Sequence, residues 1–462
     1  SGGVSRDPLP DPPPGGREVV SFDEALRFWW RLGWISFGGP AGQIAIMHRE
    51  LVERFRWISE RRFLHALNYC MVLPGPEAQQ LATYIGWLMH GTRGGIAAGA
   101  LFVLPSLFIL VALSWVYVRF GAVPAVAAFL NGVKPAVVAI VLAAAWRIGS
   151  RTLRHPLLWA IAAAALLALA MASVPFPLVI GGAALAGIIG GKLAPDAFRG
   201  AGHAPGGAPP EASVIDDDSA TPSHARFSAR RLALVIAVFL GIWGGAIGLL
   251  AAAFGWQGDF TRMAWFFTKS ALVTFGGAYA VLPYVLQGAV EENGWLTAAQ
   301  MIDGLALGET TPGPLIMVVA FVGFLGGWTK EVLGGDALLA AAIAGACVAT
   351  FFTFLPSFLF ILAGGPLVEG TRGELRLTAP LTAITAAVVG VIVNLAGYFA
   401  WHVFWPESTV AAPFSGHFNA ASVLIALAAT AALVSGRAGV IAVIAACGVA
   451  GLGLWVAGYG AM

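Results

Sequence analysis

Charged residues are scarce in this chain of 462 residues: Asp, Glu, Lys and Arg make up 11% of it, whereas a soluble domain usually carries about 25%. Hydrophobic residues make up 58%, and the mean hydropathy is +0.81. This composition excludes an ordinary soluble domain and predicts a chain that lies in a lipid bilayer. The net charge of +2 also argues against nucleic acid as a partner, because no basic face or tail is present beyond the clusters that flank membrane segments.

Cysteine is equally rare. Cys70, Cys347 and Cys447 lie far apart in apolar stretches and form no CxxC pair, so we interpret them as small buried side chains. The sequence also lacks a paired His/Cys cluster, a nucleophile elbow, a Gly-rich phosphate loop and a cofactor motif. We therefore predict no catalytic residues, no metal site and no cofactor, which leaves a membrane-embedded enzyme as a weak alternative.

What the sequence does contain is an internal repeat. Phe37-Gly38-Gly39-Pro40 returns as Phe275-Gly276-Gly277, and Pro74-Gly75-Pro76 returns as Pro312-Gly313-Pro314, both at an offset of 238 residues. Further on, Leu104-Pro105-Ser106 returns as Leu355-Pro356-Ser357 at an offset of 251. Matches in fixed register predict two copies of one unit, with 13 residues inserted in the second copy.

The Gly and Pro motifs interrupt short apolar segments. In the first copy they divide the helical pieces 22–36 and 41–56, and they break the segment 61–90. The second copy repeats this form at 261–290 and 300–327. Because a helix cannot continue through such motifs without losing hydrogen bonds, we predict broken or re-entrant helices there.

Longer apolar runs approach the ~20 residues that span a bilayer. They lie at 95–118, 123–146, 157–172, 174–192, 232–253, 337–363, 379–404, 419–435 and 437–458. The predicted fold class is therefore an all-α polytopic membrane protein, an inverted-topology repeat with about 13 apolar segments.

Changes in composition set the predicted domain boundaries. We predict a disordered N-terminal tail over 1–20, a first repeat over 21–192, a cytoplasmic linker over 193–230, a connecting transmembrane helix over 231–258, and a second, inverted repeat over 259–462. The tail and the linker are rich in Pro, Gly and polar residues, which cannot bury enough apolar surface to pack.

Charge gives the predicted orientation, because short cytoplasmic loops collect Lys and Arg. The early loop of the first copy carries Arg54, Arg56, Arg61 and Arg62, whereas the matching loop of the second copy carries only acidic charges, such as Glu292. The two copies are thus predicted to face in opposite directions, with the N-terminus in the cytoplasm and the C-terminus outside.

This arrangement predicts an anion site between the copies. Inverted repeats with interrupted helices place a substrate near the bilayer midplane, and each helix start after a break leaves free amides with a partial charge of about +0.5. The predicted substrate-binding residues are those of the breaks and the ionisable groups near them: Arg31, Phe37, Gly38, Gly39, Pro40, Pro74, Gly75, Pro76, Glu77, Gln80, Lys134, Lys269, Phe275, Gly276, Gly277, Glu309, Thr311, Pro312, Gly313 and Pro314.

Other interpretations of these residues stay open. Arg31 and Lys269 occupy equivalent positions in the two copies, but either side chain can also extend to the membrane surface without binding substrate. The breaks are also compatible with simple kinks or close helix packing. Glu77 and Glu309 suit either a proton carrier or a partner at a helix end.

These motifs resemble those of a known family, the chromate ion transporters. The resemblance lies in Phe-Gly-Gly-Pro at 37–40, Pro-Gly-Pro-Glu-Ala-Gln-Gln at 74–80, Phe-Gly-Gly-Ala-Tyr at 275–279 and Thr-Pro-Gly-Pro at 311–314. It spans the chain apart from the tail and the linker, and the fused form is similar to the long-chain branch of antiparallel duplicates. The resemblance implies a bacterial inner-membrane protein that exports chromate from the cytoplasm and confers chromate resistance.

The substrate and the transport mode have alternatives. Sulfate has the shape and charge of chromate, so it is expected as a competitor, and a sulfate or other oxyanion transporter of the same fold is the second hypothesis. An anion channel is the hypothesis from another class. Besides the anion, the expected partner is the lipid bilayer, and a homodimer is kept open because the sequence does not set the oligomeric state.

Overall fold

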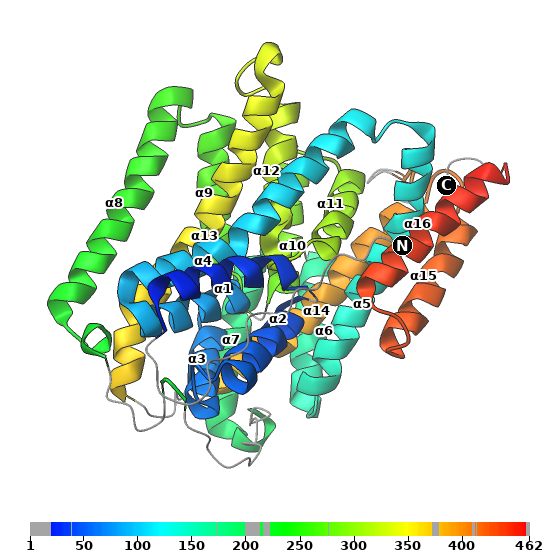
Figure 1. Ribbon diagram of the computed structural model, residues 1–462. Coiled ribbons are helices and arrows are strands. Elements are labelled where there is room, and N and C mark those ends of the chain that lie inside the picture. Colours follow the sequence, from blue (N-terminus) through cyan, green and yellow to red (C-terminus); the bar gives the residue numbers. More distant parts are fainter. Residues whose placement is uncertain are drawn as a thin grey trace.

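The computed structural model describes residues 20–37, 39–172, 174–198, 213–215, 222–275, 277–371, 378–408, 412 and 414–458. All regular elements among them are helices (Figure 1), which confirms the predicted all-α class. The predicted tail lies outside the described residues except for Val20, and so does most of the linker between the halves.

The first half of the chain forms helices that begin and end close to the predicted segments. They are α1 (Phe22–Ile35), α2 (Gly39–His48), η1 (Arg49–Arg54), α3 (Glu60–Val72), α4 (Glu77–Phe120), α5 (Pro124–Thr152), α6 (Pro156–Ala172) and α7 (Phe176–Leu193). The short turns η2 (Pro195–Phe198) and η3 (Ser223–Ala225) belong to the linker region, and α8 (Ala229–Phe254) connects the halves.

The second half follows the same order. It contains α9 (Asp259–Leu272), α10 (Ala278–Leu286), η4 (Gln287–Glu292), α11 (Ala298–Thr310), η5 (Leu315–Met317), α12 (Val318–Thr329), η6 (Gly335–Ala337), α13 (Leu338–Thr371), α14 (Thr378–Phe404), α15 (Ala420–Val434) and α16 (Val440–Val456).

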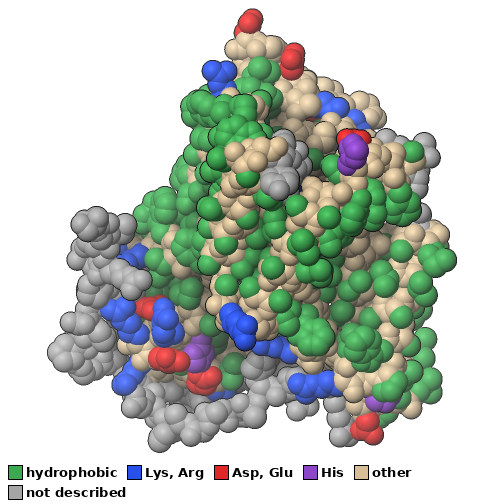
Figure 2. All heavy atoms as spheres, turned by 90° about the vertical axis from the view of Figure 1, so that its right-hand side faces the viewer, with side chains coloured by type: hydrophobic (Ala, Val, Ile, Leu, Met, Phe, Trp, Pro, Cys, Tyr) green, Lys and Arg blue, Asp and Glu red, His purple; other side chains and the backbone are tan. Residues whose placement is uncertain are grey.

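Six of the described helices are long and apolar enough to cross a membrane, namely α4, α5, α7, α8, α13 and α14. Helix α8 stands at one side of the molecule (Figure 1) and leaves large apolar side chains such as Leu240 and Leu249 exposed. Figure 2 shows a broad band of hydrophobic side chains, with Lys, Arg, Asp and Glu gathered above and below it. An apolar belt between charged ends is the surface that a lipid bilayer covers, so the chain is a multi-pass membrane protein.

The backbone repeats as the sequence does. Gly39 and Gly277, 238 positions apart, have φ of +69° and +96°, and Gly75 and Gly313 have φ of +124° and +101°. The π-helical turns η1 and η4 also coincide at this offset. Both predicted breaks of each half are therefore present, at glycines whose backbone conformation other residues rarely adopt.

Helices α3 and α11 show why equivalent elements begin at equivalent residues. Ser59 and Thr297 are the N-caps, and their side chains accept hydrogen bonds from the amides of Arg62 and Gln300 at 3.3 and 3.2 Å. Each cap satisfies one of the free amides of a first turn. Both helices then end just before a Pro-Gly-Pro break, so the cap and the break fix the same length in both halves.

The 13 extra residues of the second half lie at one turn. In the first half, α4 bends sharply at His90 and Gly91, where Gly91 has φ of 65° and ψ of −157°. In the second half, α12 and α13 are instead separated by a longer connection around Gly334, which has φ of +88°. The two halves therefore match at the breaks and differ at this turn.

Candidate functional site

The breaks of the two halves meet each other. The amide of Gly75 donates a hydrogen bond of 2.8 Å to the carbonyl of Thr274, and the amide of Gly313 donates one of 2.8 Å to the carbonyl of Ser36. These two bonds are equivalent, because the offset of 238 carries Ser36 onto Thr274 and Gly75 onto Gly313. We call this place the crossing: the described residues among 36–40, 74–80, 274–279 and 309–315, which leave out Gly38 and Gly276.

One serine of each long helix packs against a glycine of the crossing. A Cβ on Gly75 would lie 2.6 Å from Ser357 Oγ of α13, and a Cβ on Gly313 would lie 2.7 Å from Ser106 Cβ of α4. Ser106 and Ser357 are also equivalent, at the offset of 251. Each break thus packs against the long helix of the other half, at a distance that only glycine allows.

Buried glutamines add side-chain amides to the crossing in the first half only. Gln43 Nε2 on α2 donates to the carbonyl of Gly313, and Gln80 Nε2 on α4 donates to the carbonyl of Pro74 at 2.7 Å. The Oε1 atoms of both glutamines, together with Ser106 Oγ, are buried without a hydrogen-bond partner among the described residues. The crossing therefore holds more polar capacity than its own contacts use.

The acidic residues predicted for the site differ in their surroundings. Glu309, near the end of α11, accepts a hydrogen bond from the hydroxyl of Tyr279 on α10, and Arg147 of α5 interacts with it electrostatically. Glu77 is the first helical residue of α4, with Pro76 as the N-cap.

The predicted cations lie in three different environments. Arg31 is half-buried on α1, and Lys269 is exposed on α9. Lys134, on α5, lies in a pocket away from the breaks, where its Nζ donates to Asn131 Oδ1 at 2.8 Å. Phe37 is 38% exposed, whereas Gly38 and Gly276 lie outside the described residues.

A buried ion pair joins α3 of the first half to α13 of the second half. Arg62 of α3 lies 3.5 Å from Glu369 of α13, with side chains 9% and 5% exposed. Tyr84 of α4 donates to the same carboxylate at 2.5 Å. Three elements from both halves are joined there by groups that are costly to separate.

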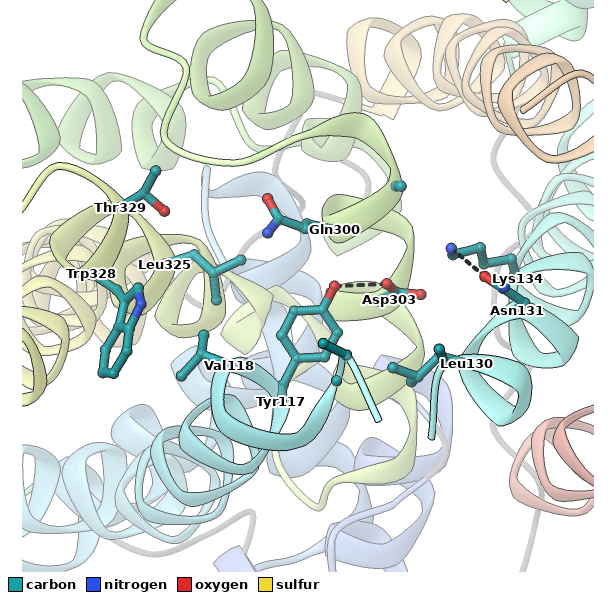
Figure 3. A pocket seen from close by; sticks show the side chains of 14 residues that line it. Tyr117, Val118, Leu130, Asn131, Lys134, Gln300, Asp303, Leu325, Trp328 and Thr329 are labelled. Atoms are coloured by element: carbon teal, nitrogen blue, oxygen red, sulfur yellow. Dashed lines mark hydrogen bonds between the residues drawn. The ribbon is translucent and has the colours of Figure 1, made fainter. Parts of the chain in front are cut away.

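The equivalent place of the repeat is open. A pocket of about 380 Å³ lies between α4, α5, α11 and α12 and is lined by Tyr117, Val118, Lys134, Gln300 and Asp303 among others (Figure 3). Gln300 and Val118 are the equivalents of Arg62 and Glu369 at the offsets of 238 and 251. The Arg62–Glu369 ion pair thus has no equivalent at the pocket.

Sequence reasoning missed several of these residues. Ser36, Gln43 and Ser106 carry no motif, and Ser106 was noted only as part of the repeat. Asp303 lies in an apolar stretch, and an ionisable residue within such a stretch is the signal that could have found it. No group of three His, Cys, Asp or Glu that could hold a metal ion occurs in the part of the chain that the structure describes.

Comparison with known proteins points to one family. The model of the chromate transporter family matches residues 24–188 and 261–452. The chromate transport protein of Pseudomonas aeruginosa is 34% identical over 385 residues, which are 82% of this chain and 80% of that protein. A probable chromate transport protein of Synechococcus elongatus is 28% identical over 376 residues, covering 81% of this chain and 83% of that protein.

A third relative is the chromate transport protein of Cupriavidus metallidurans, which is 28% identical over 372 residues, or 80% of each chain. No solved structure shows a significant match to this chain. The two matched regions lie on either side of the predicted linker and include both sets of breaks. Since the family model covers most of the chain, this protein belongs to the chromate transporter family.

Proposed function

We propose that this protein exports chromate from the cytoplasm by alternating access and thereby confers chromate resistance. The observation that carries the proposal is the pair of equivalent hydrogen bonds from Gly75 to Thr274 and from Gly313 to Ser36. They bring together helix starts from both halves, and helix starts attract anions. Interrupted helices from two related halves are the usual construction of a transporter substrate site.

The proposed site uses the buried hydroxyl of Ser106 and the free amides at the starts of α2, α4 and α10 as donors to a tetrahedral dianion. Arg31, half-buried on α1, is the proposed counter-charge. Lys269 is exposed, so we propose that it acts only through its long-range charge. Gln43 and Gln80 are proposed to hold the breaks in place.

The difference between the two ends supports the proposed alternation. The Arg62–Glu369 pair closes one end, while the equivalent place at the other end is a pocket. With the orientation predicted from charge, the closed end faces the cytoplasm and the pocket faces outward. Exchange of the open and closed ends would carry the anion across.

The membrane potential supports the proposed outward direction of chromate transport. A potential that is negative inside favours outward movement of an anion by ~2.3 kcal/mol per charge per 100 mV. A divalent anion would therefore leave a bacterial cell without a coupled proton, which supports export in the inner membrane.

Inside-out vesicles test this function. We expect vesicles that contain the protein to accumulate labelled chromate in a saturable manner, with sulfate as a weaker competitor, and we expect cells that express it to tolerate more chromate. Sulfate uptake at equal or greater affinity would instead favour the sulfate hypothesis. Unitary currents in planar bilayers would favour a channel.

Orientation is tested by accessibility labelling. Single cysteines in place of Arg54, on η1, and Glu292, on η4, are expected to react from opposite sides of the membrane, because these positions are equivalent in oppositely facing halves. A membrane-impermeant maleimide should label Glu292→Cys in intact cells and Arg54→Cys only in inside-out vesicles. Labelling of both from one side would contradict the inverted arrangement.

A further inference from the structure

The pocket lined by Tyr117, Lys134 and Asp303 is called the outer pocket below, because the orientation predicted from charge places it on the outer side. It holds a carboxylate that the crossing does not use. Asp303, on α11, is 4% exposed, and its Oδ2 accepts a hydrogen bond of 2.8 Å from the hydroxyl of Tyr117 on α4. Its Oδ1 is buried and has no hydrogen-bond partner among the described residues. Figure 3 shows the carboxylate pointing into the pocket, toward Lys134 on the opposite wall.

The two walls of the pocket require different chemistry from a ligand. On one side, the free Oδ1 of Asp303 is an acceptor and needs a donor. On the other side, the ammonium of Lys134 offers hydrogens beyond the one that it gives to Asn131. The side-chain amide of Gln300 also lines the pocket (Figure 3). A ligand that satisfies both walls must carry a hydroxyl as well as negatively charged oxygens.

The charged and titratable groups that face Asp303 are few. Tyr117 from α4 and Lys134 from α5 are the groups that interact with its carboxylate. The pocket residues of α12, Leu325, Trp328 and Thr329, carry no charge. Helix α16 has only Cys447 as a titratable residue. On α14, Tyr398 and His402 interact with Glu291 instead.

We propose that the outer pocket binds tetrahedral oxyanions in their hydroxyl-bearing form, with Asp303 accepting from the hydroxyl and Lys134 holding the charged oxygens. This inference rests on the proposed function and adds a means of selection to it. Chromate takes up a proton close to neutral pH, whereas sulfate does so only in strong acid. The pocket therefore admits hydrogen chromate and rejects sulfate, although the unprotonated chromate and sulfate dianions have the same shape.

Sulfate is rejected because it cannot donate a hydrogen bond to Asp303. Sulfate would place an oxygen against the Asp303 carboxylate, where neither atom carries a hydrogen, so the buried acceptor stays unpaired and like charges repel. A hydrogen bond to a charged group contributes about a factor of ten or more in affinity. A single carboxylate can thus give the pocket different affinities for anions of the same size.

The pocket lies on the proposed transport path. Tyr117 follows Ser106 by 11 residues on α4, which corresponds to ~16 Å along the helix. Chromate that leaves the crossing as a dianion toward this end of the molecule passes the pocket next and is held there after it takes up a proton from the outer side, so selection here acts on release.

Competition between anions tests the proposal without relying on transport. At pH 6.5, a large part of the labelled chromate carries a hydroxyl, inorganic phosphate carries one or two, and sulfate carries none. We expect phosphate to displace labelled chromate from the purified full-length protein in lipid nanodiscs at about a tenfold lower concentration than sulfate. In Asp303→Asn, whose amide donates as well as accepts, we expect the two anions to differ by less than about twofold.

Two further variants complete the test. Lys134→Gln should weaken phosphate and sulfate together without changing their order, because it removes charge and not the acceptor. Asp336→Asn, an equivalent change at an exposed residue of η6, should behave as the parent. The proposal is overturned if the parent does not prefer phosphate, if Asp303→Asn keeps the preference, or if Lys134→Gln binds both anions as the parent does.

Vesicle transport separates this proposal from the proposed function. If the parent does not move chromate at all, the function fails whatever the ranking of the anions. If the parent moves chromate and Asp303→Asn leaves the ranking unchanged, only the role of the pocket fails.

Discussion

Gly313→Val and Gly75→Val are expected to abolish chromate transport and to destabilise the fold by about 4 kcal/mol. Backbone strain at φ of +101° and +124° contributes about 1–3 kcal/mol. The added side chain meets Ser106 or Ser357, and such overpacking costs about another 1–3 kcal/mol. Relief of either strain moves the break and lengthens its bond to the other half. Thermal unfolding in detergent and uptake by inside-out vesicles measure the two effects.

Helix α8 offers the control for these variants. Gly244 has open space where a Cβ would be placed and a helical backbone, so Gly244→Val should remain active and stable. A second comparison separates the backbone strain from the steric clash. The double variant Gly313→Ala with Ser106→Gly should be more stable than Gly313→Ala alone, because it removes the clash. It should stay less stable than the parent, because the backbone strain remains. If Gly313→Val is as stable and active as Gly244→Val, the crossing does not need these glycines.

Glu369→Gln is expected to cost about 3–5 kcal/mol of stability, because it removes the buried carboxylate that pairs with the guanidinium of Arg62. In the proposed mechanism, Glu369→Gln also opens the end of the transport path that the Arg62–Glu369 pair closes. Cys70 reports this opening, since it is fully buried on α3, the helix that also carries Arg62. With Cys347 and Cys447 replaced by alanine, Cys70 should react with a maleimide faster in Glu369→Gln than in the parent.

Two other variants make the ion-pair result specific. Arg49→Gln removes a charge whose side chain is 62% exposed, and it should change stability by less than about 1 kcal/mol. The double change Arg62→Met with Glu369→Leu should recover most of the stability, because apolar residues of similar volume replace a buried pair at little cost. An unreactive Cys70 in a destabilised Glu369→Gln would show that the pair holds the fold and does not gate the path.

The helices and the breaks could be predicted because they depend on local chemistry. Apolar runs near the length of a bilayer became α4, α5, α13 and α14, and each predicted Gly or Pro break ended a helix. The fixed offset of 238 then predicted that the same backbone would occur twice, as the positive φ of Gly75 and Gly313 shows. Patterns of this kind need no knowledge of the neighbouring helices.

The contacts of the site could not be predicted in the same way. The hydrogen bonds from Gly75 to Thr274 and from Gly313 to Ser36 join backbone groups, which every residue carries. The identity of the side chains therefore does not predict them. The exposure of Lys269 could not be foreseen either. Its equivalence to Arg31 was visible, but in helices that are apolar on most sides the sequence does not tell which face meets lipid.

The bond between Gly313 and Ser36 also constrains how the protein is made. These residues are 277 positions apart, so at a synthesis rate of about 5–20 residues per second the ribosome needs roughly 15–55 s to pass from one to the other. Until Gly313 is made, the Ser36 carbonyl has the Nε2 of Gln43 as a donor, at the long distance of 3.5 Å, and we expect water to complete its hydrogen bonding. The nascent N-terminal half is therefore expected to keep water at this break until the partner segment is translated.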